Sequence, residues 1–279
     1  MGVFESELTT ADNLSLFVRA WEPETEGRAV VCLIHGLGEH SGRYAHVAAT
    51  LNGSGYVVYA FDLRGHGKSD GIRGHASSYD ILMDDISLFI AAASLRYPQM
   101  PLFLYGHSLG GSLAVNYVLR RHPVLNGVIV TAPGFRTAFA APRGKMCMLR
   151  ILYHLWPSFS VGNELDIGGL THDPEVIRTY RSDPLVHNRI TPGLALAALK
   201  AGEWAIRQAP AFPLPILLMH GSDDLLTSVA ASREFAAGAG KMCSLKIWDG
   251  LYHEIHNEPE RNQVFSIMLA WLKQRMLLH

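Results

Sequence analysis

The feature of this 279-residue chain with the clearest chemistry is a serine inside a glycine-rich hexapeptide. Ser108 lies in Gly-His-Ser-Leu-Gly-Gly, residues 106–111, between an apolar run and a helix-like stretch. Gly-x-Ser-x-Gly between a strand and a helix is typical of a nucleophile elbow, a turn so sharp that only glycine fits at its flanks. Gly106 and Gly110 occupy those flanks. The pattern predicts that Ser108 is held above a sheet as a nucleophile.

A serine hydroxyl becomes a useful nucleophile only beside a base that a third group orients. His253 and the neighbouring carboxylates Asp223 and Asp224 each follow a strand-like run, and open α/β sheets place their sites at the carboxyl ends of strands. The chain order serine, acid, histidine is that of an α/β-hydrolase triad. The residue pattern alone leaves the choice between Asp223 and Asp224 open.

The chain contains 14 histidines, so the choice of His253 needs an argument. His256 is the nearest rival on the same loop, but His253 follows the strand and the Gly250 turn more directly. His107 is the variable position of the elbow, and we expect it to point away from the place where a base must lie. The sequence therefore favours His253 as the base.

A tetrahedral intermediate needs backbone donors for its oxyanion. The residue after the nucleophile, Leu109, supplies one amide, and the glycine-rich loop at residues 35–38 can supply another from Leu37. The alternative is an ordinary glycine-rich turn. Its coincidence with the elbow and the triad order favours an oxyanion hole.

The elements that must position these residues alternate between strands and helices. Residues 5–21 alternate with period two and predict an antiparallel hairpin with one solvated face. Later apolar runs predict strands covered on both faces. These strands are expected at 29–34, 56–61, 102–105, 127–130 and 216–219, with an edge strand at 244–248. Helices are expected at 44–51, 79–97, 109–121, 228–237 and 259–277. The alternation indicates a doubly wound, mostly parallel sheet.

The alternation breaks between residues 135 and 212, where no strand-like run appears. We predict a core at residues 1–134 and 213–279 with an inserted helical lid at 135–212. Within the lid, residues 146–156 are apolar nearly all round but too few to span a bilayer. Two interpretations stay open for this segment: a helix packed against the rest of the lid, or an apolar mouth for lipid substrates.

Composition excludes several classes of protein. The formal net charge is −1 and no basic stretch is present, so a nucleic-acid partner is not expected. The acidic N-terminus lacks an apolar signal segment, which predicts a cytoplasmic protein that can also bind peripherally to a membrane surface. The three cysteines are widely separated and show no zinc-ligand spacing, so we expect reduced thiols. A mechanism with a serine nucleophile and a histidine base needs no metal and no organic cofactor.

The chain resembles the α/β hydrolases, and within them the monoacylglycerol lipase and lysophospholipase group. The resemblance covers nearly the whole chain and rests on residues 35–44, 61–71, 106–111, 182–185, 221–224 and 250–256. It implies the α/β-hydrolase fold and assigns the acid to Asp224. It also implies that Glu39, Arg43 and His256 bind the glycerol end of the substrate. The lid is the least similar part.

Together these expectations describe a serine hydrolase that cleaves esters of single-chain lipids, with a monoacylglycerol as the foremost substrate. The alternatives are a general carboxylesterase, a lysophospholipase or acyltransferase, and a non-catalytic lipid-binding protein. The apolar lid would contact the membrane surface transiently. Glu39 and Arg43 have an alternative to substrate binding, because they can pair with each other and merely brace the oxyanion loop.

Overall fold

The computed structural model describes residues 2–140 and 142–277, which form an α/β structure around one large sheet. The sheet has eight strands in the order β1-β2-β4-β3-β5-β6-β9-β10. Their bounds are β1 (Gly2–Thr9), β2 (Ser15–Glu22), β3 (Ala29–Ile34), β4 (Tyr56–Phe61), β5 (Leu102–His107), β6 (Gly127–Thr131), β9 (Ile216–Gly221) and β10 (Cys243–Trp248). Residues 1, 141 and 278–279, which the predicted units include, lie outside the described residues.

Strand directions agree with the sequence analysis. β1 pairs antiparallel with β2, which pairs antiparallel with β4, while the remaining neighbours pair parallel. The predicted hairpin and the mostly parallel, doubly wound sheet are therefore confirmed, with β10 at the edge. The parallel strands place their carboxyl ends at one edge of the sheet, and the loops that follow β3, β5, β9 and β10 carry the predicted site residues.

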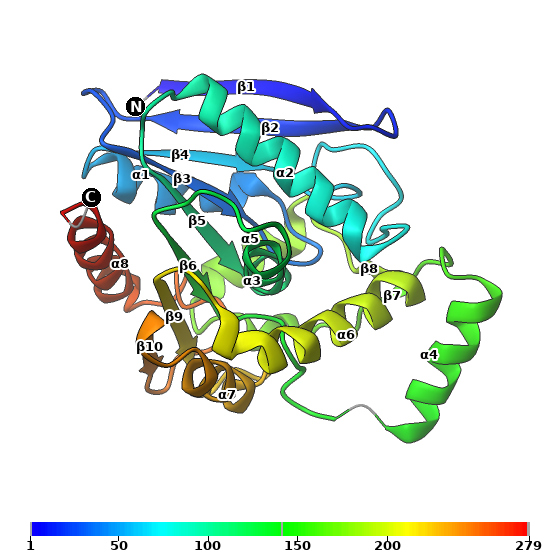
Figure 1. Ribbon diagram of the computed structural model, residues 1–279. Coiled ribbons are helices and arrows are strands. Elements are labelled where there is room, and N and C mark those ends of the chain that lie inside the picture. Colours follow the sequence, from blue (N-terminus) through cyan, green and yellow to red (C-terminus); the bar gives the residue numbers. More distant parts are fainter. Residues whose placement is uncertain (1, 141, 278–279) are drawn as a thin grey trace.

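Helices cover both faces of the sheet (Figure 1). The helices of the core are α1 (Ala45–Asn52), α2 (Tyr79–Arg96), α3 (Leu109–Arg121), α7 (Val229–Ala239) and α8 (Arg261–Met276). Apolar side chains of α1 and α8 pack with one face of the sheet, and those of α2, α3 and α7 pack with the other. All six residues of β3 are buried as a result, which explains why this strand is a continuous apolar run.

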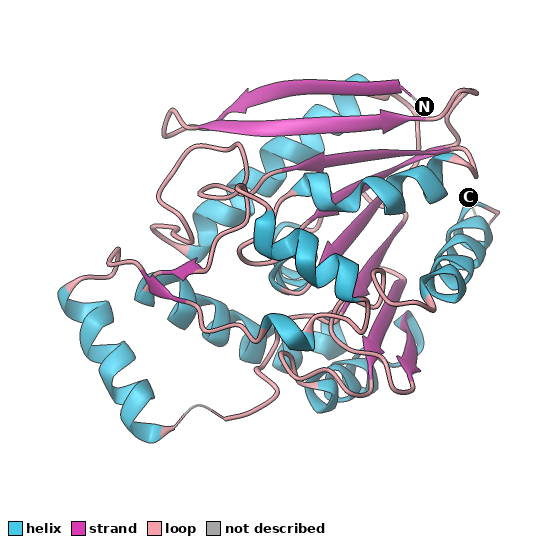
Figure 2. Ribbon diagram, turned by 180° about the vertical axis from the view of Figure 1, so that it is seen from behind, coloured by secondary structure: helices cyan, strands magenta, loops and turns pink. Residues whose placement is uncertain are grey.

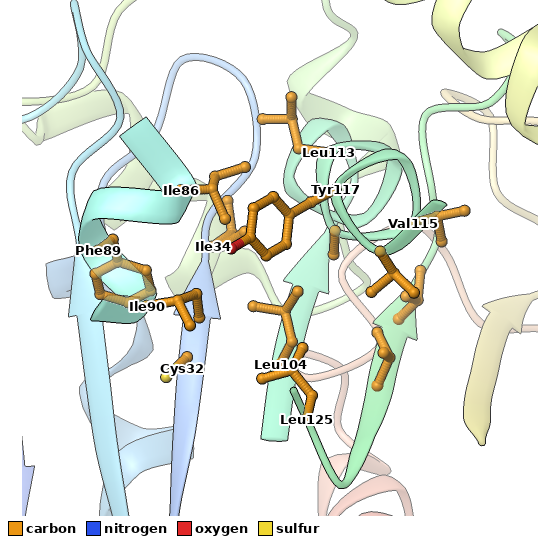
Figure 3. Close-up of a cluster of buried hydrophobic side chains, with 14 of the residues drawn as sticks. Cys32, Ile34, Ile86, Phe89, Ile90, Leu104, Leu113, Val115, Tyr117 and Leu125 are labelled. Atoms are coloured by element: carbon orange, nitrogen blue, oxygen red, sulfur yellow. The ribbon is translucent and has the colours of Figure 1, made fainter. Parts of the chain in front are cut away.

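One of these two cores holds the nucleophile turn in place. Cys32, Ile34 and Leu104 rise from the sheet toward α2 and α3 (Figure 3). The helices contribute Ile86, Phe89, Ile90, Leu113 and Tyr117 to the same cluster. Because β5 and α3 are both fixed in this packing, the turn between them has little freedom. All three cysteines are free.

The segment between β6 and β9 holds α4 (Arg143–Leu155), β7 (Val161–Gly162), α5 (Pro174–Ser182), β8 (Arg189–Ile190) and α6 (Pro192–Gln208). Short 3₁₀ helices are η1 (Ser41–Tyr44), η2 (Ile167–Gly169), η3 (Ala209–Ala211) and η4 (Gly240–Met242). No strand was predicted in this segment, but β7 and β8 form an antiparallel pair of two residues each, too short to leave an apolar run. α6 joins the core, since Leu194, Ala205 and Ile206 are buried in the same cluster as α3.

The apolar segment at 146–156 forms most of α4, a helix without a fully buried residue. Met146, Leu149 and Leu152 are half-buried, and α4 contacts α6, so one side of this helix packs against the rest of the segment, as one of the two interpretations expected. α4 lies at the edge of the molecule (Figures 1 and 2), and its remaining side chains are exposed. Among the described residues, no helix combines the length and the apolar character needed to cross a bilayer.

Candidate active site

The predicted nucleophile lies in a strained turn between β5 and α3. Ser108 has a φ of 53°, a conformation that a residue with a side chain adopts only when its surroundings enforce it. A Cβ atom at Gly106 would lie 2.3 Å from the carbonyl oxygen of Gly110, and one at Gly110 would lie 2.2 Å from the carbonyl oxygen of Ile34. Both flanks therefore require glycine, as predicted for an elbow. The turn leaves Ser108 on the wall of a cavity.

The loops after β9 and β10 bring one carboxylate to the predicted base. Nδ1 of His253 lies 2.7 Å from Oδ2 of Asp224, and both side chains are buried. Asp223 is exposed and instead accepts a hydrogen bond of 2.6 Å from the Ser222 hydroxyl. The residue pattern left the choice between Asp223 and Asp224 open, and in the structure only Asp224 contacts His253.

Asp224 is surrounded by donors. Its Oδ1 atom accepts from the amides of Leu226 and Thr227, and its Oδ2 atom also accepts from the Thr227 hydroxyl and from Nε2 of His220. Burial would raise the pKa of Asp224, but His253 and His220 lower that pKa well below its usual range. Asp224 is therefore ionised at neutral pH.

The charge on Asp224 acts on His253 in turn. Burial would lower the pKa of His253, but the charge and the hydrogen bond of Asp224 outweigh burial and raise that pKa above its usual value. With Nδ1–H donated to Asp224, the Nε2 atom is left to accept a proton. His253 and Ser108 line the same cavity. Within the described residues the Ser108 hydroxyl makes no hydrogen bond, and in proteins without substrate such catalytic contacts are often long.

The loop after β3 lies beside the elbow. A Cβ atom at Gly36 would lie 3.2 Å from Cβ of Ser108, so the loop backbone passes against the serine. Leu37 and Leu109 both line the cavity. Neither backbone amide of this pair has an acceptor among residues 2–140 and 142–277. Two free donors beside Ser108 are what the predicted oxyanion hole requires, and Leu37 and Leu109 stay its predicted members.

A buried ionic cluster forms the polar end of the cavity. Nη1 of Arg43 donates to Glu39 at 2.5 Å, and Nη1 and Nη2 donate to Glu254 at 2.7 and 2.8 Å. Oε1 of Glu39 accepts from the Gly36 amide at 2.6 Å, which ties this carboxylate to the loop after β3. Glu39 and Arg43 therefore form the ion pair that was given above as the alternative to substrate binding, and this pair braces the loop after β3. They also line the cavity, so bracing and substrate contact are compatible.

Charge balance keeps this cluster ionised. Burial would raise the pKa of Glu254, but Arg43 lowers that pKa to about 2. Burial would lower the pKa of Arg43, and Glu254 and Glu39 raise it instead. Arg43 also lies over the ring of Tyr180, with its guanidinium carbon 4.6 Å from the ring centroid. A cation held between two carboxylates and an aromatic ring has little freedom to move.

Two histidines lie elsewhere than the sequence analysis expected. His256 is buried against Tyr44 and His46, outside the residues that line the cavity, and burial lowers its pKa to about 3. His107 does not point away from the base, because its ring centroid lies 4.8 Å from that of His253. The reason is its hydrogen bond to the Thr131 hydroxyl at 3.0 Å, which turns the ring toward β6 and under the base. Burial, His256 and His253 lower the pKa of His107, so this ring is neutral.

The cavity itself has a volume of about 230 Å³ and is mainly apolar. Beyond the residues already named, its wall comes from the segment between β6 and β9 and includes Leu165, Leu170, Ile190, Leu194, Ala198 and Leu199. No residue of α4 is among the described lining residues. The wall of the cavity is formed by α6 and the loops around α5 instead, and the role of segment 146–156 as an apolar mouth for lipid substrates stays a prediction.

Three contributors to the site were missed from the sequence. Glu254 follows His253 directly, and no spacing marked it as the partner of Arg43. Tyr180 is far from Arg43 in the chain, so only the fold brings them together. His220 ends a buried strand and could have been noticed as a polar residue in an apolar run, which usually marks a functional or hydrogen-bonded position.

Comparisons with known proteins show which family the chain resembles in sequence and fold. A family model described as serine aminopeptidase, S33 matches residues 25–260. An uncharacterized abhydrolase domain-containing protein of Dictyostelium discoideum is 40% identical over 97% of this chain, which spans only 29% of that protein. A monoacylglycerol lipase of Mycolicibacterium smegmatis is 35% identical over 90% of both chains. The crystal structure of the Paleococcus ferrophilus monoacylglycerol lipase has a TM-score of 0.83 and 32% identity, covering 99% of this chain and 100% of that one.

Proposed function

Since the chain belongs to the α/β-hydrolase family described as serine aminopeptidase, S33, and is an ester hydrolase of its monoacylglycerol lipase group, we propose that Ser108 is the nucleophile and a monoacylglycerol the preferred substrate. The observation that carries the proposal is one cavity with three matched parts. Ser108 and His253 lie on its wall, apolar side chains surround most of its volume, and the cluster of Glu39, Arg43 and Glu254 forms its polar end. A lipid with a single acyl chain and a small polar head group matches this cavity, because it too has one long apolar part and one polar end.

In the first half of the reaction, His253 Nε2 takes the proton of the Ser108 hydroxyl as Oγ attacks the ester carbonyl carbon. The carbonyl oxygen gains a negative charge, which the amides of Leu37 and Leu109 stabilise. Asp224 holds the imidazole in its tautomer and stabilises the imidazolium. When the intermediate collapses, His253 gives its proton to the departing glycerol oxygen, and the acyl group stays on Ser108.

In the second half, water replaces glycerol. His253 takes a proton from the water, whose oxygen attacks the acyl carbonyl carbon, and the same amides stabilise the second oxyanion. Collapse returns the proton to Ser108 and releases the fatty acid. An alcohol in place of water would transfer the acyl group instead, so the balance between hydrolysis and transfer depends on which acceptor reaches the cavity.

The direct test is the release of fatty acid from 1-oleoylglycerol by the wild type, Ser108→Ala and the exposed control Ser77→Ala. We expect Ser108→Ala to lose activity and labelling by a fluorophosphonate probe together, while Ser77→Ala retains both. Labelling or hydrolysis that survives in Ser108→Ala would show that another residue is the nucleophile.

We also propose that residues 135–212 act as a lid whose helix α4 contacts a lipid surface. The proposal is supported by α4 itself, where Ile151 and Leu155 are 53% and 59% exposed. Arg143 and Arg150 supply positive charge on a helix without acidic residues, and its third cation, Lys145, forms an ion pair with Glu164. Exposed apolar side chains beside basic ones are typical of helices that lie at membrane interfaces.

Sedimentation with phosphatidylglycerol vesicles tests this contact. Ile151→Ser/Leu155→Ser should reduce the bound fraction of the protein severalfold. The control Val124→Ser changes a 96% exposed side chain in the loop between α3 and β6 and should leave the bound fraction unchanged. Equal loss in both variants, or no loss in either, would contradict a role for α4.

A further inference from the structure

A second hollow lies beside the catalytic cavity and differs from it in charge. It has a volume of about 500 Å³ and is lined by three arginines, Arg73, Arg181 and Arg189. None of the three has a carboxylate partner within residues 2–140 and 142–277. Leu165 and Tyr180 line both the hollow and the catalytic cavity, so the two spaces share a wall. We call this hollow the arginine pocket.

The charge of the arginine pocket is positive. Asp183 is the one carboxylate among its described lining residues, and its Oδ2 atom already accepts a hydrogen bond of 2.8 Å from Nε2 of His40. His187, also in the wall, adds no charge at neutral pH, because burial and the neighbouring Arg73 lower its pKa to about 4. Three arginines and one carboxylate therefore line the pocket, which leaves it with a positive charge.

Two buried hydrogen-bond donors of the pocket lack acceptors in the described structure. They are Nη1 of Arg73 and Nδ2 of Asn163. The Asn163 side chain is held in place, since its Oδ1 atom accepts from the Leu165 amide at 3.2 Å and its backbone amide donates to the carbonyl of Asn188 at 2.7 Å. Buried donors are nearly always paired in proteins, so these two atoms point to an acceptor that the chain itself does not supply.

Exposed arginines alone would not carry an inference, because most of them are simply solvated. Arg181 and Arg189 are exposed, and either one by itself would be unremarkable. What distinguishes this place is their convergence on one hollow with the half-buried Arg73 and with two donors that are shielded from water. An anion with several acceptor oxygens satisfies the charges and the donors together.

We propose that the arginine pocket binds a phosphate group next to the catalytic cavity. A phosphate offers up to three free oxygens and a charge between −1 and −2, which suits several guanidinium groups better than a carboxylate does. The group can be the head of a glycerophosphate lipid or product that crosses the shared wall at Tyr180, or free inorganic phosphate. The proposal concerns binding alone and does not depend on Ser108.

Isothermal titration calorimetry at low ionic strength tests it with three probes: glycerol 3-phosphate, inorganic phosphate and uncharged glycerol. Wild-type protein should bind a phosphate-containing probe, more weakly as salt is added. Arg73→Gln should weaken this binding by about tenfold or more, because it removes a charged donor that is shielded from water. Arg233→Gln, which removes an exposed arginine on α7, is the matched control and should bind as the wild type does.

The outcomes separate the sources of the phosphate and the failure of the proposal. Tighter binding of glycerol 3-phosphate than of inorganic phosphate supports a head-group site, and equal binding supports a site for the free ion. If Arg73→Gln does not fold, Arg181→Gln/Arg189→Gln changes only exposed side chains of the pocket and should still weaken binding severalfold. Absence of phosphate binding by the wild type, or equal weakening in Arg233→Gln, would overturn the proposal. None of these readouts involves ester hydrolysis, so a wrong substrate assignment would leave them intact.

Discussion

Arg43 and Glu254 form two parallel hydrogen bonds, of 2.7 and 2.8 Å, between the turn η1 and the loop that carries His253. Through Glu39 the same guanidinium is connected to the amide of Gly36, beside Ser108. One cation therefore joins the loop of the predicted oxyanion hole to the loop of the base. The relative positions of these two loops decide whether nucleophile, base and amide donors can act on the same carbonyl group.

The first prediction concerns this cation. Arg43→Met leaves Glu39 and Glu254 buried without a positive charge, and breaking a buried pair in this way typically costs about 3–5 kcal/mol of stability. We expect a lower free energy of unfolding in urea together with a loss of kcat/KM. Arg178→Met, which breaks the exposed pair with Glu175, is the control and should change stability little. Equal effects of the two substitutions would show that the buried cluster is not structurally important.

The second prediction separates the two neighbouring carboxylates. Asp224→Asn should reduce kcat by up to about 10⁴-fold, because an amide at this position favours the wrong tautomer of His253. Asp223→Asn changes an exposed side chain that bonds only to Ser222, and its kcat should stay near that of the wild type. Steady-state kinetics on 1-oleoylglycerol gives both numbers. A severe loss in Asp223→Asn with normal turnover in Asp224→Asn would reverse the assignment.

The third prediction is the pH dependence of the base. Neutral His253 is the active form, and Asp224 raises its pKa above the usual 6.5, so kcat/KM should fall as the pH drops through that raised value. Asp224 keeps its charge across this range, since its own pKa is lowered. In Asp224→Asn the main influence that raises the pKa of His253 is gone, and only the charges of Glu254 and Glu39 still oppose burial, so the acid limb of the residual activity should move to lower pH. An acid limb at the same pH in both proteins would mean that another group controls it.

The fold was predictable because its strands leave a direct trace in the sequence. β3 and β4 are buried on both faces, so each is an unbroken apolar run with the predicted bounds. α4 left an equally apolar trace, although none of its residues is fully buried and only Met146, Leu149 and Leu152 are half-buried. Apolar composition alone does not distinguish a helix whose apolar side chains are buried in the protein from one whose apolar side chains are exposed. The role of 146–156 therefore could not be read from periodicity.

The candidate site also contains residues that local sequence patterns predict and residues that they do not. Ser108, His253 and the order of the triad follow from local patterns, because an elbow needs glycines at fixed spacing and the acid and base follow strands. The choice of Asp224 over Asp223 depends on which carboxylate turns inward, and the pairing of Arg43 with Glu254 depends on two loops far apart in the chain. Such tertiary contacts have no local signature. His107 was misplaced because its orientation depends on Thr131, a residue of the next strand.

The last prediction concerns the shape of the substrate and uses two adjacent alanines of α6. Ala198 lines the apolar part of the catalytic cavity, whereas Ala197 lines a separate hollow on another side of the helix. With monoacylglycerols of increasing length, each added methylene that becomes buried contributes about 0.8 kcal/mol, or roughly fourfold in kcat/KM, until the space is full. Ala198→Phe fills part of that space, so its profile should reach a plateau at a shorter chain, while Ala197→Phe should keep the wild-type profile. Methyl esters of the same acids should be poorer substrates at every length, because they leave the polar groups of Glu39, Arg43 and Glu254 without the glycerol hydroxyls. A flat profile in the wild type, together with equal rates for methyl and glycerol esters, would replace the monoacylglycerol assignment with that of a general carboxylesterase.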